Sequence, residues 1–222
     1  KKINKYHFSL CSKPILTDRY IYLAMHFQPE SNTIPEAGIF SDQYLIASAL
    51  AEHLPDDIDK IYVKEHPAQI KSWPDNLETM HIRSENFYQK LASMDRVVLI
   101  DPFFDSETLI QNSQAVCTVA GTTGWEALKM GKPAILFGNP WYSACKNCVV
   151  YDFKKDFKNK IKKLLRLTTE EKLKNLDKFI IDISPFAFKS VSTVTFAERS
   201  IKTKVSDSEE QEIINEAAAK IV

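Results

Sequence analysis

The sequence predicts an α/β fold in which a parallel sheet carries helices on both faces. Five short apolar segments, rich in β-branched and aromatic residues, alternate along the chain with segments of helical spacing. Such alternation is typical of parallel strands joined by right-handed crossovers. Polar residues, prolines or glycines follow each apolar segment. Because ligands of open parallel sheets bind beyond the carboxyl ends of the strands, these residues are the candidates for a functional site.

The first third of the chain supplies two strands and the helix between them. Residues 19–27 have the aromatic and β-branched composition of a strand. Pro29 ends this strand, because proline has no N–H to donate to a ladder. Apolar residues recur near helical spacing over 38–53, and residues 58–64 form the second predicted strand.

The later elements follow in the same alternating order. They are a helix at 84–94, a strand at 96–100, a helix at 106–113 with Ser106 as its cap, a strand at 115–119, a helix at 122–130 and a strand at 133–137. Basic amphipathic helices are expected at 152–167 and at 168–183, with Thr169 as the cap of the second, and a polar helix at 206–221. We divide the chain into a lead-in at 1–18, a sheet domain at 19–150 and C-terminal helices at 151–222.

The segment from Gln114 to Trp141 contains four of the five glycines of the chain. Glycine suits positions where the backbone takes positive φ or approaches another group closely. Gly131 is expected as the C′ residue of the helix at 122–130. Thr122 and Thr123 can cap the start of the same helix.

The turn from Gly121 to Gly124 has the chemistry of a phosphate site. A helix start offers free N–H groups, threonine hydroxyls and the positive end of the helix dipole. A structural interpretation stands beside this one, because Thr123 and Glu126 have the spacing of a capping box. The patterns GxxxxGK[ST] and GxGxxG are absent from this turn, which excludes a Walker loop and the dinucleotide fingerprint.

Composition gives no reason to expect a nucleic-acid or membrane-spanning protein. Lys+Arg and Asp+Glu balance at 29 each, so an anion site would have to be local. No apolar run approaches the roughly 20 residues of a membrane span, and no signal peptide opens the chain. We expect a cytoplasmic protein, and the opening without Met suggests a fragment of a longer chain.

The four cysteines do not predict a metal site. Cys145 and Cys148 form a lone CxxC, and zinc would need two further ligands that no matching CxxC or HxxxH supplies. A thioredoxin-like motif would open a helix, whereas this one runs into Val149 and Val150. Two loop thiols in a reducing compartment are the favoured interpretation.

Three motifs together resemble the capsule-polysaccharide-synthesis family. They are FQPES at 27–31, VKEHP at 63–67 and GTTGWEALKMGKPAILFGNPWY at 121–142. That family includes bacterial Kdo transferases of capsule and lipopolysaccharide assembly. The resemblance implies a Rossmann-like domain that forms the nucleotide-binding, C-terminal half of a GT-B glycosyltransferase, with the N-terminal half missing. Together with the strand–helix alternation it implies the strand order 3-2-1-4-5.

The resemblance also implies which residues hold the donor. The family's His-Pro pair and Ser/Thr pair, which would bind the CMP part of a CMP-sugar, fall here on His66-Pro67 and on Thr122-Thr123 after Gly121. Glu126 lies where a glutamate holds ribose hydroxyls in many GT-B proteins.

Two of these positions could take part in the transfer itself. His66 could add a hydrogen bond or a positive charge at the departing phosphate. Glu30 could be the nucleophile of a retaining enzyme or the base of an inverting one, or only a solvated loop acid. Lys64 and Glu65 precede His66 on alternating faces, so one is expected in the sheet's packing and the other in solvent.

The leading functional hypothesis is a CMP-sugar-dependent glycosyltransferase domain, for Kdo from CMP-Kdo. The alternatives are a GT-B-like transferase that uses CDP-glycerol or a UDP-sugar, and a Rossmann-like binding module without catalysis. The expected partners are a CMP-sugar donor and a glycan or glycolipid acceptor, with no metal, no cofactor and no nucleic acid. The lysines of residues 153–166 form a solvated helix face or, alternatively, a peripheral contact with the anionic inner membrane.

Overall fold

The computed structural model describes residues 2–30, 33, 37–71, 83–154 and 156–187. Residues 1–176 form one compact unit, and residues 177–222 form a second, of which only 177–187 are described. The predicted helix at 206–221 therefore lies outside the described residues.

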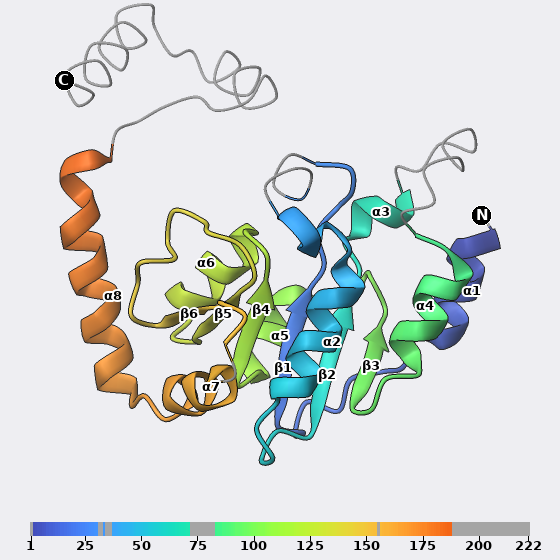
Figure 1. The fold of residues 1–222 in the computed structure, drawn as a ribbon, viewed down its shortest axis with the longest axis horizontal. Coiled ribbons are helices and arrows are strands. Elements are labelled where there is room, and N and C mark those ends of the chain that lie inside the picture. Colours follow the sequence, from blue (N-terminus) through green and yellow to red (C-terminus); the bar gives the residue numbers. More distant parts are fainter. Residues whose placement is uncertain (1, 31–32, 34–36, 72–82, 155, 188–222) are drawn as a thin grey trace, which may run out of the picture. The chain divides into compact units, whose positions relative to one another are not determined.

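A six-stranded parallel sheet forms the first unit, in the order β3-β2-β1-β4-β5-β6 (Figure 1). The strands are β1 (Tyr20–Ala24), β2 (Lys60–Lys64), β3 (Val97–Ile100), β4 (Ala115–Thr118), β5 (Ala134–Leu136) and β6 (Cys148–Val150). The predicted order of the first five strands is confirmed, with ends within three residues of those expected. β6, which pairs with β5, was not predicted.

The helices are α1 (Lys2–Leu10), α2 (Gln43–His53), α3 (Pro67–Lys71), α4 (Glu85–Ala92), α5 (Ser106–Asn112), α6 (Thr122–Lys129), α7 (Phe157–Leu165) and α8 (Thr169–Ile183), with 3-10 turns at Gly38–Ser41 and Ser184–Phe186. α1 was not predicted. Its His7 ring lies 4.3 Å from the ring of Tyr88 on α4, and the following Ser12 N–H donates to Leu99 O at 2.8 Å. The start of the chain is thus part of the first unit.

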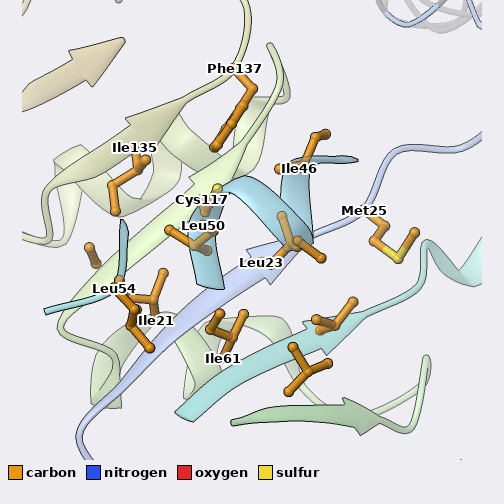
Figure 2. Close-up of a cluster of buried hydrophobic side chains, with 14 of the residues drawn as sticks. Ile21, Leu23, Met25, Ile46, Leu50, Leu54, Ile61, Cys117, Ile135 and Phe137 are labelled. Carbon is orange, nitrogen blue, oxygen red and sulfur yellow. The ribbon is translucent and has the colours of Figure 1, made fainter. Parts of the chain in front are cut away.

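Helices cover both faces of the sheet, as predicted. On one face the larger core packs β-strand side chains against α2, α4 and α7, and Figure 2 shows Leu23 and Cys117 of the sheet beside Leu50 of α2. On the other face a smaller cluster packs Tyr20, Tyr22 and Tyr62 against residues of α5 and α6. Burial on both faces explains why the strands read as continuous apolar runs without alternation.

Two predicted caps are wrong by one residue. Asp105 caps α5, because its carboxylate accepts from Thr108 N at 2.7 Å, while Ser106 is the first helical residue. Thr168 caps α8 in a capping box with Glu171, whose N–H donates to the Thr168 hydroxyl at 3.2 Å. In each place two neighbouring polar residues compete for the cap, and only the backbone path decides between them.

The lysines of α7 mostly form ion pairs within the unit. Lys158 Nζ lies 2.7 Å from Asp56, and Lys162 Nζ lies 3.7 Å from the same carboxylate. Lys160 pairs with Asp152 at 2.5 Å. These contacts support the interpretation of this segment as a solvated helix face. Within the described ranges, no helix has the length and apolarity needed to cross a bilayer.

Candidate functional site

The carboxyl ends of the strands bring the predicted site residues to one edge of the sheet. The strand order reverses between β1 and β4, which are hydrogen-bonded neighbours. The chain leaves β1 through His26, leaves β2 through His66 and leaves β4 through Gly121 into α6. This is the switch point at which open parallel sheets bind ligands. The predicted grouping of His66 with the Thr122-Thr123 turn at this edge is confirmed by the topology.

The start of α6 carries two threonine hydroxyls that do not cap it. Gly121 is the N-cap residue and makes no side-chain cap hydrogen bond, so the predicted capping box of Thr123 and Glu126 is wrong. Thr122 and Thr123 occupy the first helical turn, exposed and half-buried respectively. Within the described part of the chain neither hydroxyl is hydrogen-bonded. The helix start therefore keeps its N–H groups, two hydroxyls and the positive dipole end available for an anion.

Packing explains why this turn contains glycine. A Cβ on Gly121 would lie 3.0 Å from Thr118 Oγ1 and 3.2 Å from the His26 ring. A Cβ on Gly124 would lie 2.3 Å from the Tyr142 hydroxyl. That hydroxyl donates to Gly121 O at 2.5 Å and braces the first turn of α6 from outside. At the other end of the helix Gly131 has φ of +71°, which confirms its predicted place as C′.

His26 lies between β1 and the α6 turn, and sequence reasoning missed it. Its Nε2 lies 2.9 Å from Thr118 Oγ1 and accepts the Ala120 N–H at 3.3 Å. Burial lowers the pKa of His26 to about 4, with smaller contributions from His66 and Arg83. The ring is therefore neutral at pH 7 and acts as an acceptor. Its only sequence signal was its place at the end of the switch-point strand.

Two buried glutamines hold the chain as it leaves β1. Gln43 Oε1 accepts from His26 N at 2.8 Å, and its Nε2 donates to His26 O at 3.1 Å. Gln69 makes the same pair of bonds with the backbone of Gln28, at 2.8 and 3.3 Å. The Gln28–Pro29 peptide is cis. These two pairs of hydrogen bonds fix the backbone at His26 and Gln28, and thereby the start of the loop that carries Glu30.

A buried ion pair between Arg83 and Glu65 also supports the loop that follows β1. Arg83 Nε donates to Glu65 Oε2 at 2.6 Å, and its Nη1 donates to Gln28 Oε1 at 2.6 Å. Tyr88 donates its hydroxyl to Glu65 at 3.0 Å. Burial, ahead of the charge of Glu65, raises the pKa of Tyr88, so this hydroxyl remains a donor. The cluster fixes the end of β2 relative to the end of β1.

The expectation that one of Lys64 and Glu65 faces solvent is wrong. The two side chains do alternate in direction, but residues Lys64 and Glu65 are 4% and 1% exposed. Lys64 Nζ donates to Ser106 Oγ at 2.7 Å on the opposite face from Glu65. Burial lowers the pKa of Lys64, against the opposing effects of Asp105 and Asp101. Helices cover both faces at this depth, which leaves no solvated side.

His66 is exposed at the sheet edge and has one ring nitrogen committed. Nδ1 accepts the Ala68 N–H at 3.2 Å, and His66 O accepts from Gln69 N at 2.9 Å, so His66 precedes and caps α3. Pro67 is the first residue of that helix, where its missing N–H costs nothing. Because Nδ1 accepts, the neutral ring carries its proton on Nε2, which can donate to a ligand.

The two candidate carboxylates are both exposed. Within the described ranges neither Glu30 nor Glu126 makes a side-chain hydrogen bond or ion pair. Glu30 lies on the loop after β1, and Glu126 lies one turn into α6. Among the described residues no group of histidines, cysteines and carboxylates is arranged to hold a metal ion.

Comparison with known proteins points to one family. The model of a family described as capsule polysaccharide biosynthesis protein matches residues 34–152. Two capsule polysaccharide modification proteins LipA are similar in sequence, from Neisseria meningitidis serogroup B at 31% identity and serogroup A at 30%, each over 101 residues. Each match covers 46% of this chain and 12% of the relative, so the chain corresponds to a small part of either protein.

Solved structures with a similar chain path include two of KpsC and one of an epimerase. KpsC of Thermosulfurimonas dismutans, as beta Kdo 2,7 transferase, has 16% identity and a TM-score of 0.46 over 78% of this chain and 49% of its own. Its beta Kdo 2,4 transferase has 22% identity and a TM-score of 0.41 over 68% and 47%. UDP-GlcNAc 2-epimerase of Methanocaldococcus jannaschii has 18% identity and a TM-score of 0.43 over 76% and 42%.

Proposed function

The chain belongs to the capsule polysaccharide biosynthesis family, and on this premise we propose that it is the nucleotide-sugar-binding domain of a glycosyltransferase. The donor in this proposal is a CMP-sugar, specifically CMP-Kdo, and the process is capsule or lipopolysaccharide synthesis. The domain corresponds to one half of a GT-B enzyme. The other half, absent from this sequence, would supply most of the site for a glycan or glycolipid acceptor at the inner membrane surface.

The observation that carries the proposal is the start of α6 at the switch point. Two hydroxyls and the first N–H groups of the helix are held at an edge shared with His66. The Tyr142 hydroxyl and the neutral ring of His26 each hold the backbone of this turn through one hydrogen bond, at Gly121 O and at Ala120 N. Donors that are fixed before the ligand arrives suit a phosphate, because no reorganisation is needed when charge develops on its oxygens.

The proposed chemistry assigns a role to each candidate residue. Thr122, Thr123 and the helix N–H groups stabilise the phosphate as CMP departs, and His66 adds a hydrogen bond through Nε2. Glu126 holds the ribose hydroxyls. Glu30 acts as the base of an inverting transfer or the nucleophile of a retaining one. The proposed reaction needs no metal ion and no cofactor.

Calorimetric titration of the protein with CMP, CDP, UDP and ADP tests the proposal. Preference for CMP, unchanged by EDTA, is the expected result. Preference for UDP or CDP would favour a transferase that uses a UDP-sugar or CDP-glycerol. If none of the four nucleotides binds, the chain is a binding module of another kind and the proposal is wrong.

Replacing Thr122 and Thr123 together with alanine should weaken CMP binding by about 1–3 kcal/mol, the range for lost hydrogen bonds to a charged group. Alanine favours helix, so the fold should be unchanged. Calorimetry measures the affinity, and circular dichroism verifies the fold. Thr17→Ala, an exposed threonine before β1, is the matched control and should bind CMP as the wild type does. Equal affinity of the double variant and this control would make the two threonines purely structural.

Replacing His66 with alanine should weaken CMP binding by about 0.5–1.5 kcal/mol, the net value of one hydrogen bond. The proposed contact is a hydrogen bond from the neutral ring through Nε2, so the loss should be constant between about pH 7 and 8.5. CMP titrations of both proteins across this range measure the difference, in which the ionisation of the phosphate itself cancels. His53→Ala, which removes a half-buried histidine at the end of α2, is the control. A difference that vanishes as the pH rises would instead assign a positive charge to His66.

A further inference from the structure

The segment between β5 and β6 connects the CxxC cysteines to the start of α6. Tyr142 packs against Gly124 and donates to Gly121 O, as described above. The carbonyl of the same residue accepts the Cys145 N–H at 3.0 Å and the Cys148 thiol at 3.6 Å. Tyr142 is 1% exposed, so its ring, which contacts α6, and its carbonyl, which contacts the two cysteines, have little room to move independently. A change at the two thiols therefore acts directly on the residue that braces α6.

The two thiols are placed for a bond with each other. Cys148 N donates to Cys145 O at 2.8 Å, which closes a four-residue turn. In such a turn the first and last Cα atoms lie less than about 7 Å apart. Such a separation is compatible with a disulfide. Cys145 is buried and Cys148 is half-buried, so a small oxidant can reach the pair from the side of Cys148.

Ionisation of this pair differs from that of the other two cysteines. The neighbouring Cys148 side chain lowers the pKa of Cys145 to about 7, while the interaction with Cys145 and burial raise the pKa of Cys148. One thiolate shared between the two sulfurs is thus accessible near neutral pH. Burial instead raises the pKa of Cys11 to about 12 and raises that of Cys117 further. The reactive thiolate belongs to the CxxC pair.

We propose that Cys145 and Cys148 are a reversible redox-modification site whose oxidation to a disulfide loosens the Tyr142 brace on α6. The oxidant is hydrogen peroxide. The thiolate of the pair attacks a peroxide oxygen, which leaves a sulfenic acid and one water, and the partner sulfur then displaces the second water. Both S–H protons and two electrons pass to the peroxide, and one S–S bond forms. A dithiol reductant reverses the change.

Oxidation alters the contacts of Tyr142 in two ways. The Cys148 thiol loses its proton and can no longer donate to Tyr142 O. The two sulfurs also become bonded at about 2.05 Å, which draws Cys145 and Cys148 together and shifts the backbone that is hydrogen-bonded to the Tyr142 carbonyl. The Tyr142 ring packs directly against Gly124, where a Cβ would lie 2.3 Å from its hydroxyl, so a shift of Tyr142 changes its contact with α6.

Peptide mapping after treatment with hydrogen peroxide tests the chemical step. The expected product links Cys145 to Cys148, and dithiothreitol restores both thiols. Cys148→Ser should abolish the link, whereas Cys117→Ser, with its buried and less acidic thiol, should leave it unchanged. If Cys145 and Cys148 remain reduced, or become linked to Cys11 instead, the proposal is wrong.

Tryptophan fluorescence tests the effect on Tyr142 without any ligand. The rings of Trp141 and Trp125 lie 5.5 and 6.3 Å from the Tyr142 ring. Oxidation should change the emission reversibly in the wild type and in Cys117→Ser, but leave Cys148→Ser unchanged. An unchanged emission of the disulfide form would overturn the connection to Tyr142.

The consequence for binding rests on the proposed function. Oxidation should weaken CMP binding about two- to tenfold, the effect of losing one net hydrogen bond. Equal CMP affinity of the two redox forms would overturn the regulatory part of the proposal. If neither form binds CMP, the proposed function fails, while peptide mapping and fluorescence still decide whether the redox site exists.

Discussion

Replacing Arg83 with methionine should lower the free energy of unfolding by about 3–5 kcal/mol, the usual cost of breaking a buried ion pair from one side. The side chains of Arg83 and Glu65 are 5% and 0% exposed and their closest N···O distance is 2.6 Å. Without the guanidinium, the buried carboxylate of Glu65 loses its positive partner and is left with the Tyr88 hydroxyl and the His66 N–H as donors. Gln28 also loses its contact with Arg83. Urea unfolding followed by circular dichroism measures the loss.

Two further variants separate the buried charge from the loss of a long side chain. Arg19→Met breaks an exposed ion pair with Asp57, in which the two side chains are 50% and 64% exposed. The free energy of unfolding should fall by about 0–1 kcal/mol, because water screens this pair. The double variant with Arg83→Met and Glu65→Gln also lacks the unpaired carboxylate, so it should recover part of the lost free energy of unfolding. An Arg83→Met protein as stable as Arg19→Met would show that the buried pair does not hold the loop.

Lowering the pH from 7 to 4 should cost about 3 kcal/mol of stability through His26 alone. The folded pKa of about 4 lies below the unfolded value near 6.5, mainly because the ring is buried. Between these values the unfolded chain binds more protons than the folded one. The contribution of His26 is therefore fully present above about pH 6.5 and is lost as the pH falls towards 4.

Comparison with His26→Gln isolates this contribution, because the carboxylates and His7 titrate in both proteins. A glutamine oxygen can still accept the Ala120 N–H but does not gain a proton. Urea unfolding at several values between pH 7 and 4 should show a wild-type advantage that shrinks as the pH falls. His53→Gln is the matched control for the loss of a histidine ring elsewhere in the same unit. Parallel profiles of wild type and His26→Gln would show that His26 is not held neutral.

The apolar spacing of the chain was sufficient to predict most elements of the sheet. β1 to β5 are continuous apolar runs flanked by Pro, Gly or polar residues, and helical spacing identified α2, α4 and α7. β6 was missed because three half-buried residues at a sheet edge are too few to show a period. α1 was missed because its sequence has a weak apolar pattern, and its contacts with α4 lie far along the chain.

The candidate site was predictable where a motif is local and not where contacts are distant. The residues of the Thr122-Thr123 turn and His66 could be named because each follows a strand directly. His26 acts on Thr118, 92 residues away, and Gln28 is held by Gln69, 41 residues away. Arg83 reaches Glu65 across 18 residues, from a position that no local pattern distinguishes. The functional meaning of these polar residues depends on partners that only the fold supplies.

Local patterns along the chain were sufficient to predict the parallel α/β fold and the edge at which the candidate site lies, whereas the order of the first five strands was predicted from the strand–helix alternation together with the family resemblance. The fold and the edge follow from periodicity and from the turn chemistry of glycine and proline, which act within a few residues. Only contacts in the folded chain show that Gly121 is the N-cap residue of α6, that both Lys64 and Glu65 are buried, and that the Cys148 thiol lies against the Tyr142 carbonyl. The physical reason is that burial of a polar group is stable only with a partner, and that partner is chosen in space.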